Sequence, residues 1–201
     1  MHAPIPNRRH AISLPNVLTY ARIAAVPALA ACLLHVEGDG GRWAAFWLFV
    51  GAAITDWLDG YLARRLEQQS NLGRMLDPIA DKLIVGAALL LLVHDGTVGG
   101  VSIWATIIIL CREILVSGLR EFLAELNVKV HVTALAKWKT AAQMVALAVL
   151  IAGPAGDRIL PGISTIGIGL LWLAAVLTLW TGYDYLKAGI RHAMEVEGHG
   201  R

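Results

Sequence analysis

Charged residues are scarce in this chain of 201 residues, since Asp, Glu, Lys and Arg together make up only 16%. A soluble globular domain carries about 25% charged residues, so the composition excludes an ordinary soluble protein. Hydrophobic residues make up 57%, which also excludes a disordered or collagen-like chain. The composition favours a polytopic α-helical membrane protein, because a helix satisfies its own backbone hydrogen bonds inside a bilayer.

Cysteine is nearly absent, and Cys32 and Cys111 both lie inside apolar runs. Two such residues exclude a disulfide scaffold, and we interpret them as small core side chains. The seven histidines are scattered and form no HxxxH pair, which argues against a zinc site. A net charge of only +2 gives no support for nucleic-acid binding.

Six apolar segments approach the length of about 20 residues that crosses a bilayer. They cover residues 17–36, 43–66, 75–93, 101–123, 134–153 and 162–188. Turn-like or polar connectors separate them, and the sequence shows no internal repeat. We therefore predict an all-α, polytopic membrane protein of six transmembrane helices, forming a single domain over residues 1–201. Residues 1–16, which include Pro4, Pro6 and Pro15, are expected to form a surface segment, and residues 189–201 a cytoplasmic tail.

The basic residues orient this bundle. Of the 17 Lys and Arg residues, only Arg42 and Arg158 lie in the turns at 37–42, 94–100 and 153–161. Because basic residues accumulate on the cytoplasmic side of a membrane protein, the opposite ends of the helices are expected to face the cytoplasm. Both termini are then cytoplasmic, as six crossings require.

Four aspartates lie near the predicted cytoplasmic ends of the second and third segments: Asp56, Asp59, Asp77 and Asp81. The first two fall on one face of a helix, and the last two lie one turn apart. Because a short connector joins the two segments, we expect antiparallel neighbouring helices and converging carboxylates. An aspartate at mid-bilayer costs about 2.5–3.5 kcal/mol, and clustered carboxylates repel one another. Charges merely solvated at the interface are the alternative, which four residues on two facing arcs make improbable.

Converging carboxylates require a cation, and all-oxygen ligation suits Mg²⁺ or Mn²⁺ and, less specifically, Ca²⁺. Two divalent ions bridged by carboxylates form a site for phosphoryl chemistry. The small residues Gly60, Ala63 and Gly73 would let a bulky ligand approach the helix backbone. Arg64 can neutralise a phosphate.

The pattern D-x2-D-G-x2-A-R-x8-G-x3-D-x3-D is complete between residues 56 and 81. This pattern resembles that of the CDP-alcohol phosphatidyltransferases, six-helix membrane enzymes that transfer a phosphatidyl group from a CDP-linked lipid to an alcohol and release CMP. The resemblance implies that the four aspartates hold two divalent ions, with Asp81 also acting as the general base toward the acceptor hydroxyl. It further implies a CDP-binding pocket lined by Gly60, Ala63, Arg64 and Gly73.

The segments 14–22, 111–126, 137–147 and 174–180 resemble the bacterial members of this family whose acceptor is sn-glycerol 3-phosphate. This acceptor is a dianion, so its pocket must supply cations. The candidates are Arg112 inside the fourth segment and three residues at predicted cytoplasmic helix ends, Arg120, Lys137 and Lys139. The two lysines could instead anchor the helices at the interface, and Arg112 could form a structural pair. A direct pair with Glu113 is not expected, because adjacent helical residues point about 100° apart.

The resemblance therefore implies a homodimeric enzyme of a bacterial cytoplasmic membrane that uses Mg²⁺ or Mn²⁺, CDP-diacylglycerol and sn-glycerol 3-phosphate. The same chemistry with inositol phosphate, serine or choline is an open alternative. An aspartate-rich prenyltransferase would also bind a Mg²⁺-diphosphate, but it would not need the glycine, alanine and arginine positions of the pattern. A cation transporter should show broken helices or a repeat, and the sequence shows neither.

Overall fold

The computed structural model describes residues 14–66, 71–125 and 134–199. Within these ranges the side chains at positions 14–15, 57–66, 71, 72, 74, 125, 134–137, 184 and 188–199 lie outside the description. Six α-helices fill almost all of the described chain, and the described residues contain no strand. The prediction of an all-α fold with six helices is confirmed.

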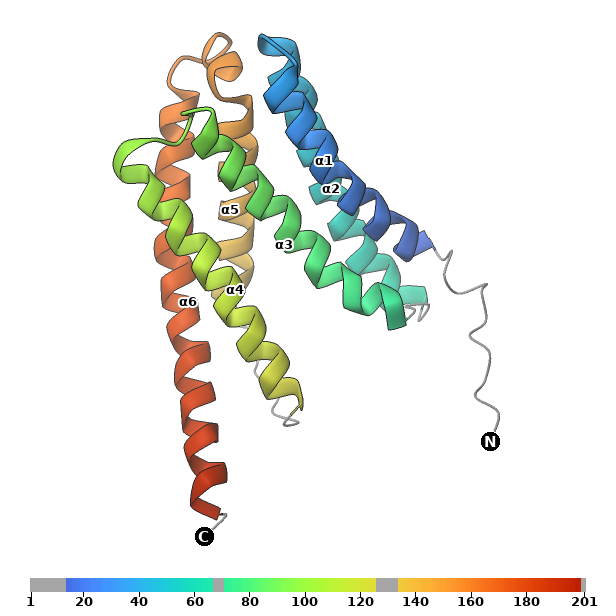
Figure 1. Ribbon diagram of the computed structural model, residues 1–201, viewed down its shortest axis with the longest axis vertical. Helices are drawn as coiled ribbons and strands as arrows, with labels where there is room; N and C mark the ends of the chain where they lie inside the picture. The colour runs from blue at the N-terminus through green and yellow to red at the C-terminus, as the bar shows by residue number, and fades with distance from the viewer. Residues whose placement is uncertain (1–13, 67–70, 126–133, 200–201) are drawn as a thin grey trace.

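Successive helices alternate in direction (Figure 1). They are α1 (Leu14–His35), α2 (Asp39–Leu66), α3 (Asn71–His94), α4 (Ile103–Glu125), α5 (Ala134–Asp157) and α6 (Ile163–His199), with a short 3₁₀ turn, η2 (Gly100–Ser102), before α4. The helical bounds differ from the predicted segments by a few residues, except that α6 continues to His199 through most of the predicted tail. The first helix begins at Leu14, inside the predicted surface segment.

Four stretches of the described chain are long and apolar enough to cross a membrane: Asn16–His35, Gly100–Ala124, Trp138–Asp157 and Ile163–Lys187. The helices α2 and α3 have 28 and 24 residues, which exceeds the roughly 20 residues of a crossing. They lie alongside the other helices in the bundle (Figure 1). The protein is therefore a helical membrane protein, and six crossings with cytoplasmic termini remain a prediction.

The apolar core lies in the half of the bundle near the turns at 36–38, 95–99 and 158–162, which we call the distal end. Each helix contributes buried residues from its distal half, among them Leu29, Phe49, Leu89, Ile109, Leu150 and Leu171. At this end Arg42 of α2 donates hydrogen bonds to Asp95 Oδ2 (2.8 Å), Thr97 Oγ1 (3.0 Å) and the Ile151 carbonyl (3.3 Å). These contacts tie α2 to the end of α3 and to α5.

Helix α1 packs against both α2 and α3, while α5 packs against α2 and α6 and α4 packs against α6. Among the described residues α2 and α3 each pack more on α1 than on each other. The two helices run antiparallel as expected (Figure 1), but α1 provides most of the packing that connects them. The carboxylates on α2 and α3 are brought together by a residue of α1 that lies against both helices.

Candidate active site

A cavity of about 710 Å³ opens in the half of the bundle opposite the distal end, where α2–α6 all contribute lining side chains. We call this the cavity end. Five of the residues singled out from the sequence line this cavity: Asp56, Asp81, Arg112, Arg120 and Lys139. The fold thus brings acidic side chains from α2 and α3 to the same space as basic side chains from α4 and α5.

On the acidic side, the guanidinium of Arg22 joins α2 to α3. Its Nη1 lies 2.8 Å from Asp56 Oδ1 and 3.1 Å from Asp77 Oδ1, and the Arg22 side chain is only 1% exposed. An arginine inside a membrane helix requires anionic partners, and these two carboxylates supply them. Arg22 therefore holds Asp56, from the first half of the sequence pattern, close to Asp77, from the second half.

Asp81 lies one helical turn after Asp77 and faces the basic side of the cavity. It also lines a narrow cavity of about 40 Å³ together with Lys82, Glu113, Lys139 and Gln143. The residue before it, Ala80, is fully buried, which fixes this turn of α3 against the bundle. Asp81 is therefore the described aspartate that shares both cavities with the basic side chain of Lys139.

The remaining predicted site residues lie partly outside the described side chains. The backbones of Asp59, Gly60, Ala63 and Arg64 belong to α2 and that of Lys137 to α5, but their side chains are not described. Gly73 is buried in the first turn of α3. The roles assigned to these residues from the sequence remain predictions.

The described carboxylates suit a hard divalent cation in their chemistry, because every donor is an oxygen. The side chains of Asp56 and Asp77 are 42% and 37% exposed, so they remain accessible while paired with Arg22. Within the described side chains, no three His, Cys, Asp or Glu residues form a group that could hold a metal ion. The side chain of Asp59, the fourth aspartate of the pattern, is outside that set.

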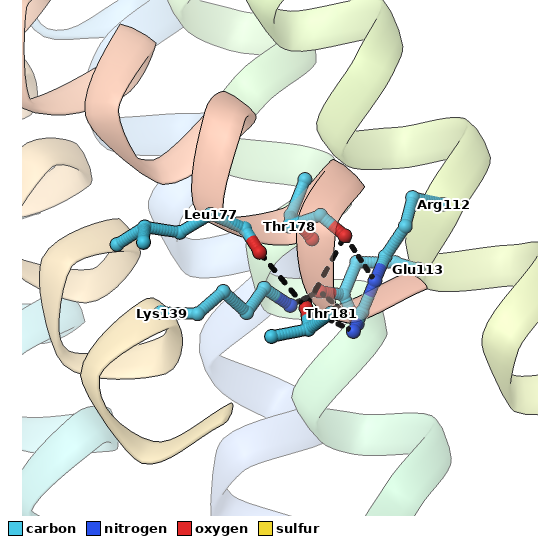
Figure 2. Close-up of polar contacts among 6 residues, drawn as sticks. All are labelled: Arg112, Glu113, Lys139, Leu177, Thr178 and Thr181. Atoms are coloured by element: carbon cyan, nitrogen blue, oxygen red, sulfur yellow. Dashed lines mark hydrogen bonds and ion pairs between the residues drawn. The ribbon is translucent and has the colours of Figure 1, made fainter. Parts of the chain in front are cut away.

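On the basic side, Arg112 is anchored to α6 (Figure 2). Its Nε donates to the Thr178 carbonyl (3.0 Å) and its Nη2 donates to Thr181 Oγ1 (2.8 Å). Its Nη1 lies 3.6 Å from Glu113 Oε1, so the expectation that these neighbours would not pair is corrected. The two Cβ atoms diverge on the helix, but the long Arg112 side chain turns toward α6 and brings its terminal nitrogen back to Glu113.

Lys139 of α5 is the second buried cation on this side. Its Nζ donates to Glu113 Oε1, and its side chain is 5% exposed (Figure 2). Arg120 lies about two turns after Arg112 on α4 and is exposed. Its guanidinium carbon is 5.9 Å from the centroid of the Tyr185 ring. This distance is within the range of a cation–π contact, which holds Arg120 at the cavity wall beside α6.

Two site residues, Arg22 and Glu113, were not singled out from the sequence. Both are charged residues inside long apolar runs, and this signal alone marks a residue that needs a buried partner. The identity of each partner could not be read from the sequence, because Arg22 and Asp77 are 55 positions apart and Glu113 and Lys139 are 26 positions apart.

Comparison with known proteins identifies the family of this chain. The family model for CDP-alcohol phosphatidyltransferase matches residues 12–180, which include every described residue of the cavity except Tyr185. The chain belongs to the CDP-alcohol phosphatidyltransferase family. The family resemblance stated from the sequence pattern is confirmed.

Several curated relatives match this chain over most of its length. A CDP-diacylglycerol–glycerol-3-phosphate 3-phosphatidyltransferase of Rickettsia bellii is 46% identical over 176 residues, covering 88% of this chain and 94% of the relative. A protein of the same name from Cereibacter sphaeroides is 39% identical over 212 residues, covering 89% and 96%. A CMP-forming cardiolipin synthase of Oryza sativa subsp. japonica is 40% identical over 205 residues, covering 92% of this chain and 60% of the relative.

Proposed function

We propose that this protein transfers a phosphatidyl group from CDP-diacylglycerol to the primary hydroxyl of sn-glycerol 3-phosphate, giving phosphatidylglycerophosphate and CMP. The observation that carries the proposal is the single cavity that places Asp56 and Asp81 opposite Arg112, Arg120 and Lys139. A carboxylate side suits activation of a hydroxyl, and a basic side suits an acceptor that carries its own phosphate. The names of the Rickettsia and Cereibacter relatives support the same reaction.

In this proposal Asp81 takes the proton from the acceptor hydroxyl. Its position between the main cavity and the narrow cavity beside Lys139 supports this role, because a base must lie within hydrogen-bond reach of the proton it removes. The hydroxyl oxygen then attacks the lipid-linked phosphorus and CMP leaves. Arg22 keeps Asp56 and Asp77 in place, and Gly60, Ala63, Arg64 and Gly73 bind the cytidine diphosphate.

Two divalent ions, Mg²⁺ or Mn²⁺, complete the proposed site, held by Asp56, Asp59, Asp77 and Asp81. The all-oxygen donor set and the exposure of Asp56 and Asp77 support this assignment. When bound, such ions neutralise the charge of the pyrophosphate bridge and stabilise the departing phosphate. The chain's own contribution is to hold the four carboxylates at one end of α2 and α3.

The acceptor phosphate would bind on the basic side, to Lys139, Arg112 and Arg120, with Lys137 adjacent on α5. Arg112 and Lys139 line the cavity while each is largely shielded from solvent, with side chains 11% and 5% exposed. Cations in such surroundings bind an anion more strongly than they would in water. Nε and Nη2 of Arg112 donate to Thr178 and Thr181 of α6. Its third nitrogen, Nη1, is the one that lies near another charged group of the cavity, Glu113.

An apolar groove of about 290 Å³ between α2 and α5 supports entry of the lipid from the bilayer. It is lined by Phe49, Val50, Ala53, Ile54, Met144, Val145 and Ala148. Ala53 and Met144 also line the polar cavity, so the groove and the cavity meet. We propose that acyl chains of CDP-diacylglycerol lie in this groove while the headgroup reaches the aspartates.

The same proposal places the protein in the cytoplasmic membrane of a bacterium as a homodimer, with the cavity end facing the cytoplasm. The basic residues that the sequence predicts toward this end and the bacterial relatives support the location. The homodimer rests on the family resemblance. The mass of the purified protein in detergent, measured by light scattering with the detergent contribution removed, tests it directly.

A second candidate acceptor rests on one specific observation, the 40% identity with a CMP-forming cardiolipin synthase. The acceptor of such an enzyme would be a phosphatidylglycerol, whose phosphodiester carries one negative charge. The several cations of this cavity fit the dianion of glycerol 3-phosphate better. Family membership also disfavours the prenyltransferase and transporter alternatives.

The experiment that tests the proposal measures CMP release by the purified protein in detergent with CDP-diacylglycerol and Mg²⁺. The acceptors offered in parallel are sn-glycerol 3-phosphate, phosphatidylglycerol, inositol phosphate, serine, choline and none. Release only with sn-glycerol 3-phosphate is expected. Release with another acceptor alone contradicts the acceptor assignment, and no release from folded protein with any acceptor contradicts the reaction.

Two controls belong to the same assay. Removal of divalent ions with EDTA is expected to stop CMP release, and Mg²⁺ or Mn²⁺ to restore it; release that survives EDTA contradicts the ion assignment. Asp81→Asn is expected to lower release by at least about 100-fold while CDP-lipid binding persists, since a general base contributes roughly that factor. The matched control Asp39→Asn alters an exposed pair at the distal end and is expected to retain activity.

A further inference from the structure

Glu113 occupies an unusual place among the cations of the cavity. A single oxygen, Oε1, accepts from Lys139 Nζ and also lies 3.6 Å from Arg112 Nη1 (Figure 2). These are two of the cations proposed to bind the acceptor phosphate. A carboxylate oxygen shared by the two cations takes the position that an oxygen of a bound anion would take.

The two cations differ in how freely they can leave Glu113. Arg112 is fixed to α6 by Thr178 and Thr181, and its Cγ lies only 3.2 Å from where a Cβ on Gly182 would be, so α4 and α6 approach closely here. Lys139 has a flexible four-carbon stem and three rotatable donors. Its Nζ donates to Glu113 Oε1. Lys139 is therefore the cation that can exchange one anion for another.

The pair also lies where such an exchange would matter. Glu113 and Lys139 line both the main cavity and the narrow cavity that reaches Asp81. A phosphate bound to Lys139 would thus lie beside the proposed base. In sn-glycerol 3-phosphate the primary hydroxyl is only a few bonds from the phosphate. An acceptor held by its phosphate at this point would therefore present that hydroxyl near Asp81.

We propose that Glu113 is a specificity-determining residue that competes with the acceptor's phosphate for Lys139. This inference rests on the proposed function and deepens it by naming the class of acceptor. A phosphomonoester dianion carries more charge than a carboxylate and draws Lys139 away from Glu113. A neutral alcohol or a singly charged phosphodiester gains too little from Lys139 to replace Glu113, so Glu113 selects phosphomonoester acceptors.

The charge argument sets the direction of the effect. Removing one negative charge near a bound anion strengthens anion binding, and at an effective dielectric constant near 20 the gain over a few ångströms exceeds about tenfold in affinity. Water in the cavity reduces this value. We expect Glu113→Gln to lower the KM for sn-glycerol 3-phosphate by about fivefold. The amide oxygen still accepts a hydrogen bond from Lys139, so the geometry is retained while the charge is lost.

The experiment measures the KM values of both substrates for wild type, Glu113→Gln, Lys139→Gln and the double variant. The inference predicts that Glu113→Gln lowers the KM for sn-glycerol 3-phosphate, leaves the KM for CDP-diacylglycerol unchanged, and makes inorganic phosphate a stronger inhibitor. Lys139→Gln should raise the acceptor KM, and adding Glu113→Gln should partly restore it, because the opposing carboxylate is gone. Glu121→Gln on the same helix is the matched control, since Glu121 is exposed and lines neither cavity.

Two results overturn the inference. One is an acceptor KM that is unchanged or raised in Glu113→Gln while the lipid KM is unaltered, and the other is a double variant no better than Lys139→Gln alone. If Glu113→Gln cannot be purified in folded form, the comparison of the double variant with Lys139→Gln decides the question, because both lack the buried lysine charge. A wild-type protein that releases no CMP with sn-glycerol 3-phosphate contradicts the proposed function itself, which separates that failure from failure of the inference.

Discussion

Arg22 is the cation that joins the two halves of the aspartate pattern. It is almost fully buried, and the two carboxylates that it contacts come from helices that pack on α1. A buried charge that loses its partners is strongly destabilising. Arg22 therefore contributes to the fold and to the site through the same contacts.

Replacing Arg22 by Met should leave Asp56 and Asp77 without the guanidinium that lies between them. We expect the free energy of unfolding to fall by about 2 kcal/mol and CMP release to be lost, since a hydrogen bond to a charged group contributes about 1.5–3 kcal/mol and the carboxylates that remain are partly exposed. Thermal unfolding in detergent measures the first effect. Arg22→Lys is expected to be only a partial substitute, because one ammonium does not reproduce a planar guanidinium between two carboxylates.

The control for this change is Arg158→Met, which removes an arginine from an exposed pair with Asp39 at the distal end. Exposed pairs contribute at most about 1 kcal/mol, so this variant should unfold near the wild-type temperature. Equal destabilisation by both variants would contradict a special role for Arg22.

The aspartate pattern could be identified from the sequence because its residues are close together along the chain and their spacing is fixed. The partners of these residues could not, since Arg22 meets Asp77 across 55 positions and Lys139 meets Glu113 across 26. Such pairs depend on how helices pack, which local spacing does not encode. The expectation that Arg112 would not pair with Glu113 failed for the same reason, because anchoring on α6 redirects the Arg112 side chain.

At the scale of the helices, hydropathy located all six elements to within a few residues over most of their length, because each helix contains a long apolar stretch bounded by polar or turn-forming residues. Hydropathy did not reveal that α1 packs against both α2 and α3. It also did not reveal the bend in α5. Gly153, which precedes Pro154, has a φ of 42° and a ψ of −125° that interrupt the helix.

The bend in α5 is fixed by Arg42 as well as by the glycine. A Cβ on Gly153 would lie 2.6 Å from Arg42 Nη1, the same nitrogen that donates to the Ile151 carbonyl. A side chain at this φ is strained, and it would also push Arg42 away from its partners. We expect Gly153→Ala to lower the free energy of unfolding by about 1–3 kcal/mol, measured by thermal unfolding in detergent.

Gly118→Ala provides the matched control, because Gly118 lies within α4 and a Cβ there meets nothing within 4 Å. Alanine in a helix interior is favoured over glycine by about 0.5–1 kcal/mol, so this variant should be as stable as wild type or slightly more so. A Gly153→Ala protein as stable as Gly118→Ala would show that the bend is not held by Arg42 and the glycine.

At the scale of the whole molecule, the apolar core and the large charged cavity lie at opposite ends of the bundle. The start of α1 and the end of α6 lie at the same end of the bundle (Figure 1). The apolar core fills the distal half, while the cavity and its charged lining occupy the other. The apolar groove and the charged cavity meet at Ala53 and Met144, which is where the proposed function requires a lipid and a water-soluble acceptor to come together.

The two basic residues at the distal end do not oppose this orientation. Arg42 lies 2.8 Å from Asp95, and Arg158 lies 2.6 Å from Asp39, so both charges are paired within the protein. The sequence predicts the other Lys and Arg residues toward the opposite ends of the helices, and this asymmetry favours a cytoplasmic cavity end. We therefore expect the distal turns outside the cytoplasm and the end of α6 inside it.

Cysteine labelling in intact bacterial cells tests this orientation. In a background in which Cys32 and Cys111 are replaced by Ala, Arg158→Cys should react with a membrane-impermeant maleimide added outside. Lys187→Cys, exposed near the other end of α6, should react only after the cells are permeabilised. Labelling in the reverse order would place the cavity outside the cytoplasm, away from CDP-linked lipid headgroups and sn-glycerol 3-phosphate. It would contradict the proposed location while leaving the assay in detergent as an independent test of the reaction.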